Sequence, residues 1–471
     1  MNTPEYSQEQ KTLLPPPHST LHSMARGFTA LRHRNFRLFW CGQLVSLIGT
    51  WMQGLGQQWL VYVLTGSAFN LGIVSAFQFL PVLFFSLPGG VVADRLPKRT
   101  LIICTQTASM LLALTLGLLT WTGVVQIWHV YLLAFLLGIV NAFDMPTRQA
   151  FIVEMVGQED LMNAIALNSS IFNGSRVLGP AAGAFIISVV GIAGCFFLNA
   201  LSFVAVIIGL FLIRLPAREK PAAARRNPFS QIGEGLRYIH DDRRVLLVFL
   251  LVSFIGVFAI PNYTTLMPVI ADQVLHVGVA GLGTLTAFLG LGAVIASVSL
   301  AYTNTPEQRR FFMMFGAASA ATLLIVFSFS HSFALSLAML AGVGFCVVAN
   351  NATGNTIIQS YVPNHLRGRV MSVWSLVLVG LAPIGSFFAG SLADHTGALL
   401  TVRVGAFVCL AAAVVIVPQL LGWRWSRRTD DPQRRDPNKA PAIHAQTLAR
   451  DFTPHPSDIH LIEHEGAQHG D

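Results

Sequence analysis

The feature that most constrains this chain is a series of long apolar runs. Each has the length of about 20 residues that an α-helix needs to cross ~30 Å of hydrocarbon. The pattern predicts an all-α membrane protein with twelve transmembrane helices in two six-helix halves. The predicted spans are Leu38–Leu64, Phe69–Ala93, Leu101–Trp121, Trp128–Ala150, Ala164–Val190, Gly194–Leu215, Val245–Val269, Gly281–Tyr302, Phe311–Ser330, Phe333–Ile358, Ser372–Ala393 and Leu399–Leu421.

Composition excludes most soluble proteins. Of the 471 residues, 53% are hydrophobic and only 11% are charged. A soluble protein carries about 25% charged residues, so this chain has too few to cover the surfaces of two or more soluble domains. No Gly-Lys-Ser/Thr phosphate loop occurs, and the five cysteines show no paired spacing. We therefore expect no nucleotide, metal or other cofactor and no disulfide framework.

The basic residues fall on one side of the predicted spans. Of the 30 Lys and Arg, 28 lie in the N-terminal segment, the connections after every second span, and the C-terminal tail. The exceptions are Arg176, inside the fifth span, and Arg403, near the start of the last. Cytoplasmic loops are enriched in Lys and Arg, so both termini are predicted to be cytoplasmic. The net charge of +8 then reflects topology, and no nucleic-acid partner is expected.

The spans and the polar intervals between them predict five regions. Phe229, Ile232, Leu236 and Ile239 recur at helical spacing between charges, which predicts an amphipathic helix on the cytoplasmic face. The polar end of the chain has no apolar periodicity and is expected to be disordered. The regions are a cytoplasmic N-terminal segment (1–35), an N-terminal six-helix half (36–215), a cytoplasmic linker with the amphipathic helix (216–244), a C-terminal six-helix half (245–423) and a cytoplasmic tail (424–471).

The connection between spans 2 and 3 carries a motif, GVVADRLPKR, from Gly90 to Arg99. A glycine at a helix end lets a neighbouring helix approach, and the cations hold the acidic group in place. The motif resembles the signature loop of the major facilitator superfamily, which latches the two halves together on the cytoplasmic side. The resemblance implies a conformational gate formed by Gly90, Asp94, Arg95, Lys98 and Arg99. The alternative is that these cations only set the topology.

Span 5 contains a second motif, GSRVLGPAAGA, from Gly174 to Ala184. Glycine and proline inside a helix thin and bend it, so that another helix packs closely. The motif is similar to the one associated with the antiporter, or exporter, branch of the same superfamily. This resemblance adds Gly179, Pro180 and Gly183 to the predicted gate. A plain packing face of small residues is the alternative.

Three further stretches, Leu31–Trp40, Asp144–Arg148 and Leu366–Met371, resemble the enterobactin-exporter-like branch. The resemblance runs from Ala30 to Trp423. It implies a secondary active transporter, not an enzyme, that exports siderophore- or drug-like small molecules by alternating access and proton antiport. It also implies a multi-pass location in the bacterial cytoplasmic (inner) membrane. One chain holds both halves, so a monomer is expected. The alternatives are an importer or facilitator of a small metabolite, or a polytopic membrane sensor or enzyme.

Polar side chains inside the spans are the candidates for substrate or proton binding, because each is costly unless paired or hydrated. The resemblance implies that spans 1, 4, 7 and 10 line the cavity. A single amide can equally form only an interhelical hydrogen bond. The candidates are Gln53, Gln57, Asn141, Asp144, Arg148, Arg176, Asn262, Tyr263, Asn350, Asn351 and Asn355, with Gln43 and Gln58 also in span 1.

Among these candidates, the charged residues lead to one hypothesis. Asp144 is predicted to pair with either Arg148, one helical turn away, or Arg176. Protonation of Asp144 would then bias the protein between its states. Arg176 could instead bind an anionic substrate. Proton coupling itself is implied by the resemblance, because span 1 carries no carboxylate.

Overall fold

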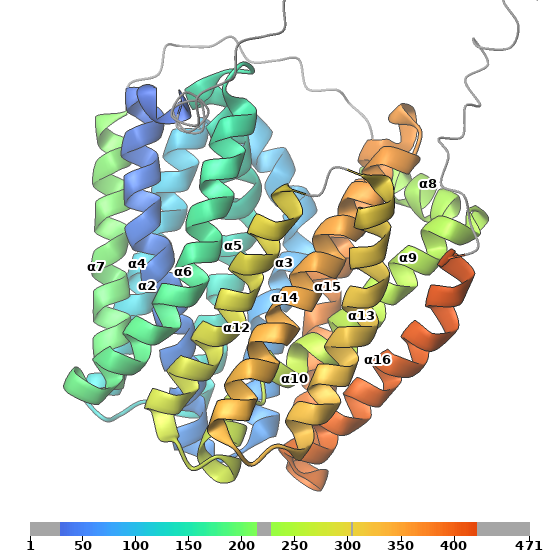
Figure 1. Cartoon of the computed structure of the whole chain (residues 1–471). Helices are drawn as coiled ribbons and strands as arrows, with labels where there is room; N and C mark the ends of the chain where they lie inside the picture. The colour runs from blue at the N-terminus through green and yellow to red at the C-terminus, as the bar shows by residue number, and fades with distance from the viewer. Residues whose placement is uncertain (1–28, 214–227, 303–304, 422–471) are drawn as a thin grey trace, which may run out of the picture. The chain divides into compact units, whose positions relative to one another are not determined.

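The computed structural model describes residues 29–213, 228–302 and 305–421. Within these ranges every regular element is a helix and no strand occurs (Figure 1). The other residues include most of the predicted N-terminal segment, the Arg-rich part of the predicted linker and the predicted tail from residue 424. The expectations for those segments therefore lie outside the described residues.

The first part of the chain forms a short 3₁₀ turn and six long helices. Local chemistry sets their ends, as the junction of the first two long helices shows. Gly66, with φ of 61°, takes the left-handed conformation that ends one helix, and the Ser67 side chain accepts a hydrogen bond from Asn70 N to cap the next. The elements are η1 Thr29–Arg32, α2 Arg34–Thr65, α3 Ala68–Arg95, α4 Lys98–Trp121, α5 Ile127–Val156, α6 Leu161–Val190 and α7 Ile192–Leu212.

The second part begins with a short helix and continues with a broken helix and five long ones. Two of the long helices start at side-chain caps, Thr305 and Ser332. The elements are α8 Pro228–Asp241, α9 Arg243–Phe254, η2 Ile255–Ala259, α10 Ile260–Thr264, α11 Met267–Val269, η3 Ile270–Val274, α12 Gly278–Ala301, α13 Pro306–Phe329, α14 Phe333–Tyr361, α15 Asn364–Thr396 and α16 Ala398–Leu421.

The seventh predicted span is not one regular helix. A proline lacks the amide hydrogen and clashes with the carbonyl four residues earlier, and this segment contains Pro261 and Pro268. The π-helical turn η2 lies just before Pro261, and a turn at Thr265 and Leu266 interrupts the helix before Pro268. The π-helical turn η3 follows. Turns of this kind are frequent at functional sites.

Ten described helices are long and apolar enough to span a membrane. These include the broken segment Arg243–Val274 as one span. Two predicted spans, in α2 and α6, do not reach the same hydropathy, although both helices are long. The physical reason is that α2 and α6 carry amides, and α6 carries Arg176 as well. The count of twelve transmembrane helices therefore stays a prediction.

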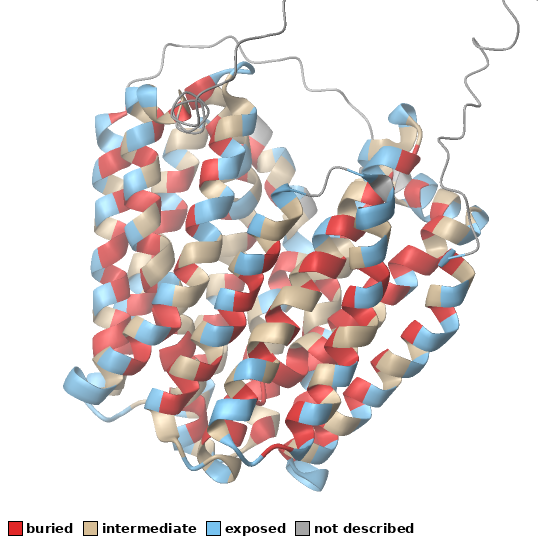
Figure 2. Cartoon of the chain, viewed as in Figure 1, coloured by how far each residue is buried: buried red, intermediate tan, exposed pale blue. Residues whose placement is uncertain are grey.

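Small residues bring helices from the two parts of the chain together. A Cβ at Gly72 of α3 would lie 2.5 Å from the carbonyl oxygen of Ser386 in α15. A Cβ at Gly290 of α12 would lie 2.8 Å from the carbonyl oxygen of Arg176 in α6. The helix pairs α3–α15 and α6–α12 thus cross with their backbones nearly touching. Buried residues lie on the sides of the helices that face one another, as Figure 2 shows.

The short helix α8 covers the segment predicted to be amphipathic. Its Glu234 forms an ion pair with Arg369 of α15, and a Cβ at Gly235 would lie 2.7 Å from the Arg369 carbonyl oxygen. Ile239 is buried, whereas Leu236 is 51% exposed. The helix therefore packs along the start of α15, but the protein covers only part of its predicted apolar face.

Candidate functional site

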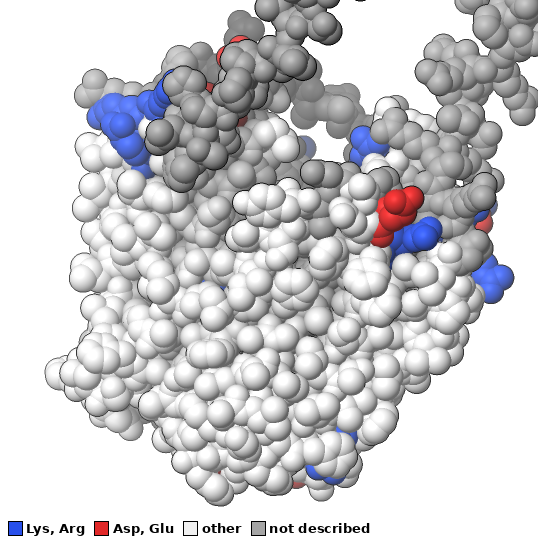
Figure 3. All heavy atoms as spheres, viewed as in Figure 1, with Lys and Arg blue, Asp and Glu red and all other residues white. Residues whose placement is uncertain are grey.

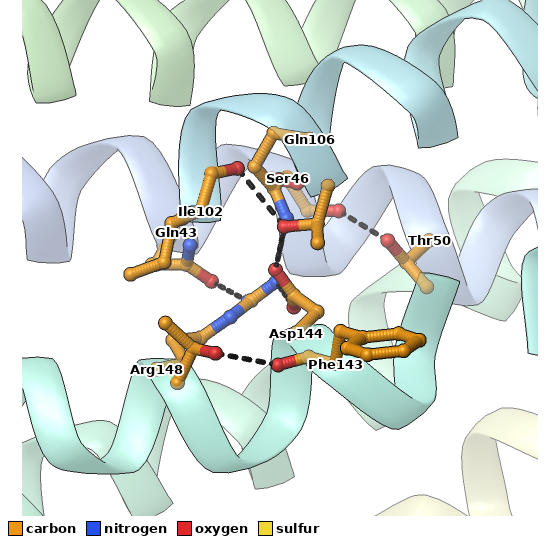
Figure 4. Close-up of polar contacts among 10 residues, drawn as sticks. Gln43, Ser46, Thr50, Ile102, Gln106, Phe143, Asp144 and Arg148 are labelled. Carbon is orange, nitrogen blue, oxygen red and sulfur yellow. Dashed lines mark hydrogen bonds and ion pairs between the residues drawn. The ribbon is translucent and has the colours of Figure 1, made fainter. Parts of the chain in front are cut away.

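A charged cluster lies inside the first group of helices, by which we mean α2–α7; α8–α16 form the second group. Asp144 of α5 is only 4% exposed and forms an ion pair with Arg148, one turn further along the same helix. Its Oδ1 accepts hydrogen bonds from Thr105 Oγ1 at 2.6 Å and from Gln106 Nε2 at 3.0 Å, both in α4. Arg148 also donates a hydrogen bond to Gln43 of α2. We call these five residues the Asp144 cluster (Figure 4).

The cluster joins three helices through an ion pair: Asp144 accepts the hydrogen bonds from α4, and Arg148 donates the one to α2. The i,i+4 spacing in α5 places Asp144 and Arg148 on the same helix face, and α2 and α4 supply the remaining partners. Three other buried polar atoms of the cluster have no hydrogen-bond partner among the described residues: Gln43 Nε2, Gln106 Oε1 and Arg148 Nε. The cluster therefore keeps hydrogen-bonding capacity that rearranged side chains or water can use.

The structure decides between the two partners predicted for Asp144. Its partner is Arg148. Arg176 of α6 instead lies over the ring of Trp51 in α2, with 5.7 Å from Cζ to the ring centroid. Its guanidinium also interacts with the hydroxyl of the buried Tyr263 in α10. The two arginines therefore belong to separate environments.

Four of the amide candidates have hydrogen-bond partners away from the Asp144 cluster. Three of these bonds are short: Asn199 donates to Gln53 at 2.6 Å, and Asn262 and Asn350 each donate to a backbone carbonyl at 2.6 Å, those of Phe258 and Met313. The fourth is Asn355, which accepts a hydrogen bond from Gln359 of its own helix. Gln53, Asn262 and Asn350 are buried. These amides are thus engaged in packing in this conformation.

The remaining candidates differ in burial. Gln57 of α2 is buried, and Asn141 of α5 is half-buried, three residues before Asp144. Asn351 of α14 is half-buried, and its Oδ1 has no hydrogen-bond partner. Sequence reasoning missed Thr105 and Gln106. Both are polar residues inside an apolar span, which is the signal that could have found them.

Two basic residues at the start of α4, Lys98 and Arg99, connect this helix to α5 and α7. Lys98 forms an ion pair with Glu154 of α5 at 2.6 Å. Arg99 donates hydrogen bonds to the carbonyl oxygens of Leu210 and Phe211 at 2.7 and 3.0 Å, and so caps the C-terminal end of α7. Arg95 is exposed, and the Asp94 side chain lies outside the described residues.

The close helix approach expected at Gly90 occurs one residue earlier. A Cβ at Gly89 would lie 2.5 Å from the carbonyl oxygen of Ala142 in α5, whereas a Cβ at Gly90 would meet no atom of the described residues within 4 Å. The expected reason for Gly90 was therefore wrong. The 100° turn per residue of a helix points the two positions in different directions, and only the packing of α5 shows which one is crowded.

The small residues of the second motif do provide close packing. A Cβ at Gly179 would lie 2.9 Å from the carbonyl oxygen of Ile48, and one at Gly183 would lie 3.2 Å from that of Met52, both in α2. On another side of α6, a Cβ at Gly283 of α12 would lie 2.9 Å from the carbonyl oxygen of Pro180. Helix α6 is thus held tightly between α2 and α12.

We call the end of the bundle where α2, α4 and α6 begin the basic end. On the face that Figure 3 shows, charged atoms lie toward the ends of the bundle, and the broad surface between them carries almost none. At the basic end, a 2.7 Å hydrogen bond from His33 to Asp160 lowers the pKa of Asp160 below its ordinary value, and a bond from Thr29 adds to the effect. This contact ties the start of α2 to the start of α6.

At the opposite end, two hydrogen bonds cross between the helix groups. Tyr62 Oη of α2 donates to Asp272 Oδ2 of η3 at 2.7 Å. Ser67 Oγ, in the α2–α3 junction, donates to Asp394 Oδ1 near the end of α15 at 2.9 Å. Sequence reasoning missed both pairs, because their members are separated by 210 and 327 residues.

Comparison with known proteins identifies relatives over most of the chain. It is 25% identical to the staphyloferrin A transporter of Staphylococcus aureus over 374 residues, which are 78% of this chain and 91% of that protein. It is 26% identical to the multidrug efflux pump Tap of Mycolicibacterium fortuitum (76% and 89% covered). Identity to the enterobactin exporter EntS of Escherichia coli is 22% (84% and 94% covered).

Solved transporter structures share the fold. A bacterial homologue of the human lysosomal transporter Spinster, crystallised in an inward-facing and unoccupied conformation, matches with a TM-score of 0.64 and 15% identity. The match covers 84% of this chain and 99% of that one. The family model described as transmembrane secretion effector matches residues 25–450. The chain therefore belongs to the transmembrane secretion effector family of the major facilitator superfamily, a family of membrane transporters and not of enzymes.

Proposed function

We propose that this protein exports siderophore- or drug-like small molecules across the bacterial inner membrane by alternating access, in exchange for protons. It works as a monomer with both termini in the cytoplasm. The names of the relatives, which include an enterobactin exporter and a multidrug efflux pump, support the substrate class and the direction. The positions of Lys and Arg along the sequence support the orientation.

The observation that carries proton coupling is the buried Asp144 cluster. Removing a charge pair from water costs several kcal/mol per ion, on the order of what its attraction and hydrogen bonds return. Protonation of Asp144 abolishes its ion pair with Arg148, the residue that is bonded to Gln43 of α2, and weakens the hydrogen bonds that Asp144 accepts from Thr105 and Gln106 of α4. Proton binding at Asp144 can therefore shift the equilibrium between two conformations that differ in how α2, α4 and α5 pack.

Everted membrane vesicles test the proposal. In these vesicles an exporter pumps its substrate inward, so the uptake of a panel of dyes and a catechol siderophore is measured after energisation, with and without a protonophore. We expect accumulation that the protonophore abolishes and that empty-vector vesicles lack. Accumulation that is insensitive to the protonophore would contradict proton exchange.

Variants of Asp144 separate coupling from folding. Asp144→Asn leaves the half-buried Arg148 without its acidic partner, and the cost should lie below the ~3–5 kcal/mol of a fully buried pair because Arg148 is 21% exposed. The double variant Asp144→Asn/Arg148→Gln removes both charges and is expected to recover most of that stability. Both should lose protonophore-sensitive uptake. The exposed carboxylate of Asp241 provides the matched control, and Asp241→Asn should transport normally. Full activity in the double variant would exclude Asp144 as the coupling residue.

A further inference from the structure

Arg176 places a positive charge inside helix α6, and no acidic side chain among the described residues neutralises it. It lies near the middle of α6, 14 residues from the helix end at Val190, or about 21 Å at 1.5 Å per residue. Among the described residues, the ion pairs are His33–Asp160, Lys98–Glu154, Asp144–Arg148 and Glu234–Arg369, so Arg176 has no acidic partner there. A charged side chain at this depth is expensive, and it normally pairs or contacts a substrate.

The surroundings of Arg176 are aromatic. Its guanidinium lies over the ring of Trp51, which itself packs edge-on against Phe172 with 5.8 Å between ring centroids. On another side, Arg176 interacts with the Tyr263 hydroxyl. Arg176 is half-buried, and a cation–π contact compensates part of the cost of desolvating its charge, but the contact supplies no negative charge. The cluster therefore offers one positive charge, one phenolic hydroxyl and one indole face.

The three side chains come from both groups of helices. Trp51 and Arg176 belong to α2 and α6, and Tyr263 belongs to α10, between the π-helical turn η2 and the break at Thr265. The backbone of α6 contacts α12 at Arg176 itself, where Gly290 leaves room for it. A ligand held here touches both groups of helices, and irregular helices near the bilayer midplane are where transporters bind their substrates.

We propose that Arg176, Trp51 and Tyr263 bind the anionic, aromatic part of the exported molecule. The anionic oxygen accepts hydrogen bonds from the Arg176 guanidinium and the Tyr263 hydroxyl, and the aromatic ring packs on Trp51. Because Arg176 lies about 21 Å from the end of α6, the proposed anion is a free substrate and not a lipid headgroup. The inference rests on the proposed function, since it names the substrate class of the exporter.

Two dyes with the same xanthene skeleton test this site. Fluorescein is an anion at neutral pH, and rhodamine 6G is a cation. Their binding to the purified full-length protein in nanodiscs is measured by fluorescence polarisation without a proton gradient. We expect the wild type to bind fluorescein more tightly than rhodamine 6G. Arg176→Gln should weaken fluorescein binding about tenfold or more, the effect of losing a hydrogen bond to a charged group. It should leave rhodamine 6G binding within about twofold of wild type, because no cation relies on that bond.

Further variants serve as controls. Arg176→Lys keeps the charge and should retain part of the preference for fluorescein. Arg403→Gln changes an arginine that donates to the Ser328 carbonyl oxygen and lies over the Phe329 ring, outside the proposed site. It should leave both affinities unchanged.

Three outcomes would overturn the proposal. One is a wild type that binds fluorescein no better than rhodamine 6G. Another is an equal loss of both dyes in Arg176→Gln, which would indicate a structural role. The third is unchanged fluorescein binding in that variant. Because binding is measured without a gradient, selective binding without protonophore-sensitive uptake would refute the proposed coupling and keep the site.

Discussion

Gly89 and Gly90 are adjacent in sequence and opposite in environment. A methyl group at Gly89 meets the backbone oxygen of Ala142, and one at Gly90 meets none of the described atoms within 4 Å. Gly89→Ala should therefore destabilise the protein by about 1–3 kcal/mol, the usual cost of overpacking. Gly90→Ala should leave stability unchanged or raise it by up to about 1 kcal/mol, because alanine loses less entropy in a helix.

The thermal unfolding midpoints of the two purified variants check this prediction. Each variant is the matched control of the other, since both make the same chemical change in the same helical turn. If Gly90→Ala has a lower unfolding midpoint than Gly89→Ala, the close contact between Gly89 and Ala142 does not determine stability in this turn.

At the scale of the element, the start of α6 is held to the start of α2 by Asp160 and His33. The hydrogen bond from His33 lowers the pKa of Asp160 in the folded protein. A lowered carboxyl pKa contributes stability above the unfolded value of about 3.9, and this contribution is lost as pH falls through the folded pKa. The contact should therefore stabilise α6 at neutral pH and cease to do so in acid.

Asp160→Asn is expected to have a modestly lower unfolding midpoint than wild type at pH 7. The difference should disappear only as the pH falls through the lowered folded pKa of Asp160, below the unfolded value of about 3.9, where the wild-type carboxyl group also becomes neutral. His33→Ala removes the same bond from the other side, so the double variant should be no less stable than the worse single variant. A difference between Asp160→Asn and wild type that persists at low pH would show that another interaction of Asp160 matters.

For the whole molecule, the contacts at the end opposite the basic end hold the helix groups together. The bonds Tyr62–Asp272 and Ser67–Asp394 each use a carboxylate as acceptor. Hydrogen bonds to charged groups contribute about 1.5–3 kcal/mol, and 1.4 kcal/mol is a tenfold change in a ratio of states. The double variant Tyr62→Phe/Ser67→Ala should therefore raise the fraction open at this end about tenfold or more.

Spin labels on exposed positions at this end, Val124→Cys and His331→Cys, report the opening as a distance distribution. They are placed in a background without the five native cysteines. We expect a larger long-distance population in the double variant. Tyr131→Phe is the control, because its bond to Asn70 lies within one helix group. An unchanged distribution in the double variant, or an equal change in the control, would contradict this prediction.

The features that the sequence alone determined depend on residues that lie close together along the chain. Eleven of the twelve predicted spans lie on described helices apart from their end residues, and the seventh is interrupted at Thr265 and Leu266. Burying apolar side chains and pairing every backbone group in lipid leaves few alternatives to a helix. The family followed from motifs that are continuous in sequence. The pairing of Asp144 with Arg148 was one of two predicted options, since i,i+4 neighbours on a helix face each other.

Only the tertiary structure decided which helix faces touch. It placed Thr105 and Gln106 of α4 beside Asp144, and it placed Arg176 over Trp51 with no acidic partner among the described residues. It also moved the close helix approach from Gly90 to Gly89. Helical periodicity shows which residues share a face, but rotation about the helix axis and the choice of neighbour depend on packing across long sequence separations. The candidate site depends on those choices, so sequence alone could propose its residues but not assemble them.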